Sequence, residues 1–215
     1  MKKEKQKRMR KAAGFLTAFA LWTAAVILVD VQPIGPMGSS VGLASLNGAV
    51  YRLTGVRMAV YALTDWLSLV PVFFMLSFAC LGLVQWMKRR SFLAVDRSIL
   101  ALGAFYVIVL AAYVLFEVLA VNYRPVLIEG VLEVSYPSST TMLVLCVIPT
   151  AMMQMEERIK RVPCKGIMIG IMAVYTVGMV VLRLLSGVHW FSDIVGGILL
   201  SAGLVSLYSA FSGME

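Results

Sequence analysis

Charge is scarce in this sequence, and cysteine and histidine are scarcer still. Asp, Glu, Lys and Arg make up 14% of the 215 residues, whereas hydrophobic residues make up 60%. An ordinary soluble domain is about one quarter charged and about half apolar. The mean hydropathy of +0.89 therefore excludes a soluble globular protein. The apolar residues come in unbroken blocks of about 20, which as helices match a bilayer core of about 30 Å. The composition predicts an all-α, polytopic membrane protein.

The few cysteines give no sign of a disulfide framework or a metal site. Cys80, Cys146 and Cys164 are far apart, without a CxxC motif or a Cys/His cluster around them. The formal charge of +8 could suggest a nucleic acid partner, but most basic residues stand in short runs at the ends of apolar blocks. That placement is typical of membrane topology. We expect no nucleic acid partner, no metal and no cofactor.

Six apolar blocks are long enough to span a membrane, and Gly, Pro, Ser and basic residues separate them. They lie at about 12–31, 63–86, 99–121, 138–155, 166–186 and 191–211. The first follows a basic leader, residues 1–11, as in a signal peptide, but its length and the absence of a small-x-small site favour an uncleaved span. Residues 12–215 are then one six-helix domain. Within it, residues 32–61 are expected to form an irregular outer segment, re-entrant or amphipathic.

The basic residues divide unequally between the two sides of the membrane. With the N-terminus inside, the cytoplasmic segments hold fifteen of the nineteen: seven in the leader, four after the second span and four after the fourth (Arg158, Lys160, Arg161 and Lys165). This asymmetry predicts a plasma-membrane protein with both termini cytoplasmic. The four outer cations are all arginine, the residue suited to bidentate phosphate binding: Arg52, Arg57, Arg124 and Arg183.

Three short polar segments fall at the outer, extracytoplasmic ends of the last four spans. They are residues 123–125 (Tyr-Arg-Pro), 136–140 (Tyr-Pro-Ser-Ser-Thr) and 183–193, which runs from Arg183 through His189 to Asp193. Two guanidinium groups and a helix N-terminus make a cradle for an oxyanion or phosphate. Spaced at i and i+4, His189 and Asp193 would share a helix face, and the carboxylate would orient the imidazole as a base or nucleophile.

Each of these residues has a plainer interpretation when it is taken singly. A lone histidine beside Trp190 and Phe191 fits a headgroup contact at the membrane interface, and Asp193 fits an ordinary charge at a helix N-terminus. The order and the spacing of the whole set favour a functional site.

The set resembles the type-2 phosphatidic acid phosphatase superfamily, which includes lipid phosphate and lipid diphosphate phosphatases. The family pattern is Lys, six residues, Arg-Pro; then Pro-Ser-Gly-His; then Ser-Arg, five residues, His, three residues, Asp. The resemblance covers the third to the sixth span. It implies that His189 is the nucleophile that accepts the phosphoryl group, and that Asp193 orients the imidazole of His189. It also implies a phosphate cradle of Arg124, Ser138, Arg183 and the backbone near Ser139, and no metal.

The chain departs from the family pattern at four positions. Glu117 stands where the family has lysine, Leu182 where it has serine, Ser139 where it has glycine, and Thr140 where it has the histidine that acts as general acid. The chain has one histidine in total, so no second histidine can supply the acid. Glu117 is expected to pair with Arg183 or Arg124, or to be protonated, and together with Tyr123 to modulate the site.

The leading interpretation is a phosphatase that hydrolyses a lipid phosphate or diphosphate, such as an isoprenoid diphosphate or a phospholipid phosphate, through a phosphohistidine. The alternative is a weak or inactive homologue that binds lipid phosphates without turnover. A mutant in which the general-acid histidine was changed to Thr140 in order to trap a ligand would look the same. A small transporter or channel subunit has only the six spans in its favour. The partners expected are the lipid substrate and membrane lipids. The sequence does not indicate the oligomeric state.

Overall fold

The computed structural model describes residues 2–159 and 165–212, and the described part is helical with no β-strand. The all-α prediction is confirmed. The helices are α1 (Lys2–Leu28), α2 (Ala44–Thr54), α3 (Met58–Leu67), α4 (Leu69–Arg89), α5 (Arg97–Leu119), α6 (Ser139–Arg158), α7 (Lys165–Leu185) and α8 (Phe191–Phe211). Two 3₁₀ turns, Pro36–Gly38 and Phe92–Ala94, lie between them. Lys160, Arg161 and Cys164, which the sequence analysis used, lie outside the described residues.

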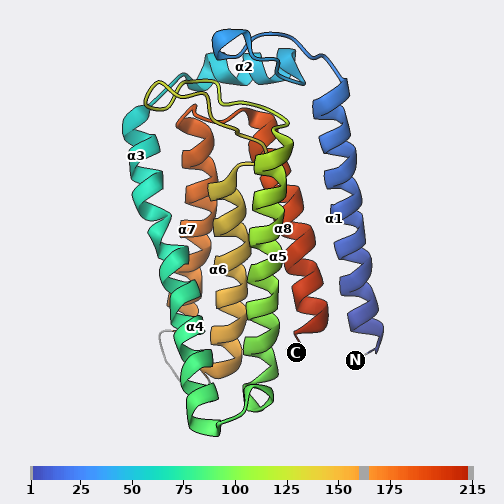
Figure 1. The fold of residues 1–215 in the computed structure, drawn as a ribbon, viewed down its shortest axis with the longest axis vertical. Coiled ribbons are helices and arrows are strands. Elements are labelled where there is room, and N and C mark those ends of the chain that lie inside the picture. The colour runs from blue at the N-terminus through green and yellow to red at the C-terminus, as the bar shows by residue number, and fades with distance from the viewer. Residues whose placement is uncertain (1, 160–164, 213–215) are drawn as a thin grey trace.

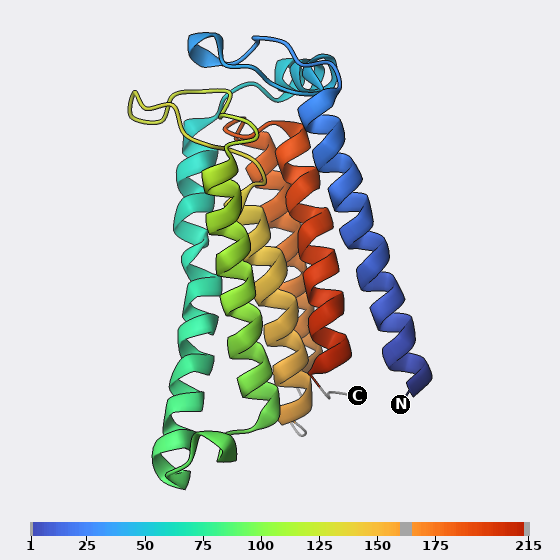
Figure 2. The ribbon, with the colours of Figure 1, turned by 45° about the vertical axis from the view of Figure 1, so that its right-hand side comes forward.

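The long helices run lengthwise beside one another, and α2 lies across one end of the bundle (Figure 1). The beginning of α1 and the end of α8 lie near each other at the opposite end (Figure 1). The loop between α5 and α6 and the turn between α7 and α8 share the end that α2 covers (Figure 2). The polar segments singled out in the sequence therefore lie at one end of the bundle, away from the termini.

Among the described residues, five helical segments are long and apolar enough to cross a membrane: Lys2–Leu28, Met58–Arg89, Arg97–Leu119, Lys165–Leu185 and Phe191–Phe211. Many of their large side chains are exposed, such as Val118 and Val174 with exposed fractions of 78% and 75%, as expected of surfaces that face lipid. Helix α6, which covers the fourth apolar block, is not among the five. It packs against α4, α5, α7 and α8, so its residues meet protein and need less apolarity. The number of spans stays a prediction.

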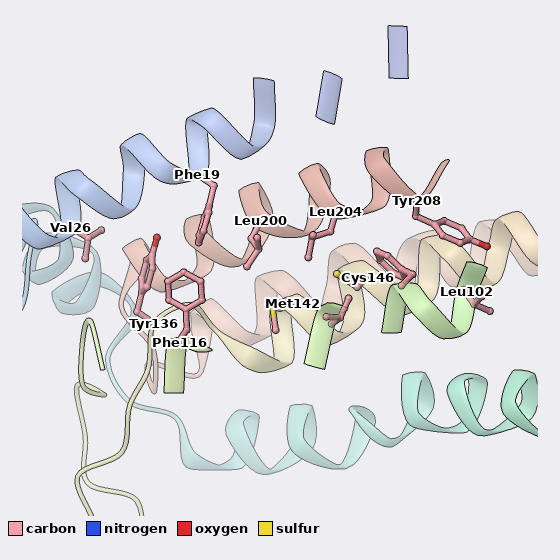
Figure 3. Close-up of a cluster of buried hydrophobic side chains, with 12 residues drawn as sticks. Phe19, Val26, Leu102, Phe116, Tyr136, Met142, Cys146, Leu200, Leu204 and Tyr208 are labelled. Carbon is pink, nitrogen blue, oxygen red and sulfur yellow. The ribbon is translucent and has the colours of Figure 1, made fainter. Parts of the chain in front are cut away.

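A buried apolar cluster ties α1, α5, α6 and α8 together (Figure 3). Three rings pack at the end nearest the polar segments: Phe19 lies edge-on to Phe116 at 5.4 Å between centroids, and Phe116 lies edge-on to Tyr136 at 5.9 Å. The Tyr136 hydroxyl hydrogen-bonds to Thr23 of α1 at 2.7 Å. These contacts fix the loop that leads into α6 against the body of the bundle.

Residues 32–61 are more regular than the sequence predicts. Helix α2 occupies Ala44–Thr54, and α3 already begins at Met58. An isolated antiparallel bridge between Gln32 and Val41 closes the loop before α2. Glycine and proline therefore interrupt only the two ends of this segment, and the middle forms a helix because it lies on the protein beneath it.

Candidate active site

Helix ends position the polar segments beneath α2. Arg183 lies in the last turn of α7, Asp193 lies in the first turn of α8, and His189 lies in the turn between them. Ser138 caps the start of α6, and its backbone N–H donates to the carbonyl of Asp193 at 3.1 Å. That bond joins the start of α6 directly to the start of α8. Arg124 reaches the same place from the α5–α6 loop.

His189 and Asp193 face each other, with His189 Nδ1 3.7 Å from Asp193 Oδ2. Both side chains are buried. The expectation that they share a helix face was wrong, because α8 begins at Phe191 and His189 precedes it. Asp193 reaches back instead: its Oδ2 accepts the backbone N–H of Trp190 at 2.9 Å, which caps the helix. The same oxygen therefore caps α8 and faces the imidazole.

The two arginines meet over one aromatic ring. The guanidinium carbon of Arg183 lies 4.9 Å from the centroid of the Tyr61 ring, and that of Arg124 lies 5.9 Å from it. Arg183 also donates from Nη1 to the hydroxyl of Thr64 at 3.1 Å. Helix α3 thus supplies a cation–π platform and a hydrogen-bond acceptor, neither of which the sequence analysis identified.

Glu117 does not take the place predicted for it. The carboxylate beside Arg124 is Glu133, whose Oε2 lies 3.0 Å from Arg124 Nε across the hairpin-like α5–α6 loop. Glu117 is exposed on α5, and no ion pair involves it among the residues that the structure describes. The pairing was mispredicted because Glu117 and Arg124 are separated by the end of α5, where Ala120 adopts a left-handed conformation and turns the chain. Tyr123 contributes its carbonyl, which accepts the indole N–H of Trp190 at 2.8 Å.

Within the part of the chain that the structure describes, several buried nitrogen atoms in this cluster have no hydrogen-bond partner. They are Arg124 Nε and Nη1, Arg183 Nε, and both ring nitrogens of His189. Arg124 Nε is within ion-pair distance of Glu133 but is not aligned with it as a donor. Leaving a buried polar group unpaired costs about 1–3 kcal/mol, and more for a charged one. Such a concentration of unpaired nitrogens in one place is the arrangement expected of a site for an acceptor-rich ligand.

The electrostatics of the cluster favour a neutral imidazole. Burial lowers the pKa of His189 well below its ordinary value, and the nearby positive charges of Arg183 and Arg124 lower it further. Ionised oxygens would be attracted by the same arginines. The site therefore combines an uncharged nucleophilic nitrogen with two cations.

Two cavities meet at the start of α6. One, of about 10 Å³, touches His189, Glu117 and Ser139, and the other, of about 280 Å³, is an apolar space between α4, α5 and α6 that is lined by Ser139 and Thr140. Both are also lined by Tyr113. The structure places Thr140 on the apolar space and Ser139 between the two. Ser138 is buried, and its hydroxyl accepts from Thr141 N at 3.4 Å as the cap of α6.

Two asparagines that the sequence analysis passed over bind the residues around Asp193. Asn122 Nδ2 lies 3.3 Å from Asp193 Oδ1, and Asn47 of α2 binds Ser192. A signal was present in the sequence, because these are the two asparagines of the whole chain. No cluster of three or more His, Cys, Asp or Glu side chains suited to a metal ion occurs within residues 2–159 and 165–212.

Comparisons with known proteins bear on the family and on the fold. Residues 119–214 match the family model described as PAP2 superfamily. Over 93% of this chain and 94% of the other, the fold is similar to the crystal structure of a transmembrane PAP2 type phosphatidylglycerolphosphate phosphatase from Bacillus subtilis, with a TM-score of 0.61 and 19% sequence identity. A search of curated proteins gave no significant match. Residues 119–214 of this membrane protein therefore match the PAP2 superfamily, the group of type-2 phosphatidic acid phosphatases that the motifs resemble, and the fold of the chain is similar to that of a transmembrane PAP2-type phosphatase.

Proposed function

We propose that this protein is a membrane phosphatase that hydrolyses a lipid phosphate or lipid diphosphate through a phosphohistidine at His189. The observation that carries the proposal is the group of buried, unpartnered nitrogens on Arg124, Arg183 and His189. Two guanidinium groups held over one ring repel each other, and a phosphate dianion between them would relieve the repulsion and accept their hydrogen bonds. The family model that residues 119–214 match supports a phosphatase in general terms.

The contact with Asp193 supports a separate role for each nitrogen atom of His189. Nδ1 faces the carboxylate and would carry the proton, which leaves the lone pair of Nε2 free to attack phosphorus. As the N–P bond forms, the P–O bond to the leaving group breaks. The imidazole becomes positively charged, and Asp193 stabilises that charge. Water then attacks the phosphohistidine, releasing inorganic phosphate and restoring His189. The arginines stabilise the negative charge on the phosphoryl oxygens in both steps.

The leaving group favours a diphosphate. A lipid alkoxide is a strong base that needs a proton to leave, whereas a lipid diphosphate expels a phosphate monoester that leaves without one. Thr140 cannot donate that proton near neutral pH, since its hydroxyl is too weak an acid. The apolar space beside Thr140 suits a hydrocarbon tail, because burial of apolar surface is favourable. We place the site on the extracytoplasmic side of the plasma membrane, with both termini in the cytoplasm, on the distribution of basic residues.

The space at His189 is too small for a phosphate group as it stands, so binding must move its lining apart. The α5–α6 loop, which carries Arg124 and Glu133, is the element best placed to move, because Glu133 is partly exposed and the loop lies at the surface (Figure 2).

A weak or inactive homologue that only binds lipid phosphates is the second candidate. The absence of a histidine at position 140 favours it.

Release of inorganic phosphate by the purified protein tests the proposal. A lipid diphosphate should be hydrolysed by the wild type and not by His189→Ala. A brief incubation with substrate labelled in the terminal phosphate should leave acid-labile label on the wild type alone. Arg183→Met should abolish turnover, whereas Arg52→Met, a matched outer arginine that is exposed, should not. Binding of lipid phosphate without phosphate release would support the second candidate, and turnover by His189→Ala would exclude a phosphohistidine.

A further inference from the structure

Both asparagines of the chain converge on the residue that precedes Asp193. Asn47 Nδ2 donates to the hydroxyl of Ser192 at 2.9 Å, and Asn47 Oδ1 accepts the backbone N–H of Ser192 at 3.0 Å. Asn122 Nδ2 lies 3.4 Å from the same hydroxyl. All three side chains are buried, with exposed fractions of 1% or less. Buried amides are costly unless they are paired, so this arrangement is specific.

The network ends on the carboxylate of Asp193. Its Oδ1 lies within reach of Asn122 Nδ2, at 3.3 Å, and of the Ser192 hydroxyl, at 3.5 Å, while its Oδ2 accepts the Trp190 N–H and faces His189. One oxygen is thus held by the side-chain network and the other is presented to the imidazole. Rotation of the carboxylate would break both sets of contacts together.

The same network fastens α2 over the site. Asn47 lies on α2 and also donates to the carbonyl of Gly42 at 2.7 Å, and Asn122 Oδ1 accepts the Gly42 N–H at 3.3 Å. Gly42 allows this approach, since a Cβ there would lie 1.5 Å from the carbonyl oxygen of Val26. The outer segment is therefore bonded to the start of α8 through polar side chains.

We propose that Asn122, Asn47 and Ser192 are positioning residues. They hold the carboxylate of Asp193, and through it the imidazole of His189, in the orientation needed for phosphoryl transfer, and they make α2 a working part of the active site. The inference rests on the proposed function for its kinetic consequence, but the orientation of His189 can be measured without turnover.

The single histidine of the chain makes that measurement direct. With ¹⁵N-histidine incorporated, the protein in detergent micelles gives the imidazole signals of His189 alone. In the wild type we expect the proton on Nδ1, facing Asp193. Asn122→Leu removes the amide while keeping the side-chain size close, and should shift the population toward the Nε2–H tautomer. Asn47→Leu should shift it less, because Asn47 reaches Asp193 only through Ser192.

The kinetic readout separates positioning from substrate binding. Asn122→Leu should lower kcat for a lipid diphosphate about 10- to 100-fold, the effect of a small misplacement of a reacting group, with KM changed by less than about twofold. Gln154→Leu is the matched control. Gln154 is an equally buried amide that binds Ser98 and Tyr208 at the other end of the bundle. Its loss should lower thermal stability but leave the imidazole signals and KM unchanged.

Unchanged imidazole signals and kcat in folded Asn122→Leu would overturn the proposal, as would equal changes in Gln154→Leu. If Asn122→Leu does not fold, Asn122→Asp and Ser192→Ala replace it. The first keeps the acceptor for Gly42 and places a second carboxylate at Asp193, and the second removes only the shared hydroxyl. Either should shift the tautomer, and no shift in both overturns the inference. A tautomer shift in a protein without phosphatase activity would support positioning and refute the proposed function alone.

Discussion

A histidine in place of Thr140 should change the substrate preference of this protein. Thr140 is the second residue of α6 and lines the apolar space, while its neighbour Ser139 also lines the small cavity at His189. An imidazole at position 140 would stand between the phosphorus attacked by His189 and the lipid tail. In the proposed mechanism the leaving oxygen would occupy that place. The space of about 280 Å³ gives the larger side chain room without movement of the backbone.

The size of the effect follows from the basicity of the leaving group. General acid catalysis contributes about 10²–10⁴ in rate, equivalent to about 3–5 kcal/mol of barrier, and the full amount applies when an alkoxide leaves. Thr140→His should therefore raise kcat for a lipid monophosphate by about 10²–10⁴, and kcat for a lipid diphosphate by less than about tenfold. The wild type should prefer the diphosphate by a comparably wide margin.

The assay is phosphate release from both lipids by the purified wild type and Thr140→His. The double variant that also carries His189→Ala should be inactive, which would show that the new histidine has not become the nucleophile. Equal turnover of monophosphate and diphosphate by the wild type would refute the argument from leaving-group basicity. No gain for either lipid in folded Thr140→His would show that position 140 does not face the leaving oxygen. Activity gained from none would show that the threonine silences the site.

Three further changes test the electrostatics and the geometry of the site. Glu133→Gln removes the carboxylate beside Arg124 and should tighten competitive inhibition by inorganic phosphate several-fold; weaker inhibition would show that Glu133 instead holds the arginine in place. Gly187→Ala should destabilise the protein by at least about 1–3 kcal/mol, because φ is +69° there and a Cβ would lie 1.9 Å from a backbone oxygen at the end of α2, whereas Gly178→Ala has open space and should melt like the wild type. Because the pKa of His189 is lowered on folding, the unfolded chain binds the extra proton, so stability should fall as the pH drops below about 6.5, and His189→Gln should flatten that dependence in melting curves.

The helices, and the fact that the polar segments lie at one end of the bundle, could be predicted from local sequence pattern. The hydrogen-bond network around Asp193 could not. Long apolar blocks predict helices wherever they occur, and the spacing of Arg183, His189 and Asp193 is short enough for one turn to bring them together. The prediction that His189 and Asp193 share a helix face was wrong for a local reason. The i, i+4 spacing implies a shared face only within one helix, and α8 begins at Phe191, after His189.

The contacts made by α3 and α2 lie beyond local pattern. Tyr61 and Thr64 meet Arg183 across more than 100 residues of sequence, and nothing in their own neighbourhood distinguishes them from other tyrosines and threonines. Asn47 is different, because an asparagine is rare in this chain and its rarity could have been noticed. What could not be foreseen is that α2 folds back over the start of α8 and brings Asn47 to Ser192.

The modest apolarity of α6 has a consequence for how the protein is made. A helix that gains little from lipid by itself inserts poorly as an isolated segment, and α6 is shielded by α4, α5, α7 and α8 once it is in place. Its stable insertion therefore depends on neighbours that are synthesised both before and after it. Since the backbone N–H of Ser138, which caps α6, donates to the carbonyl of Asp193 in the last helix, the contact between these two helix starts forms only when synthesis reaches α8. Premature termination within α8 should leave a chain that stays in the membrane but is degraded by membrane proteases, because α6 then lacks the helix α8 that it packs against.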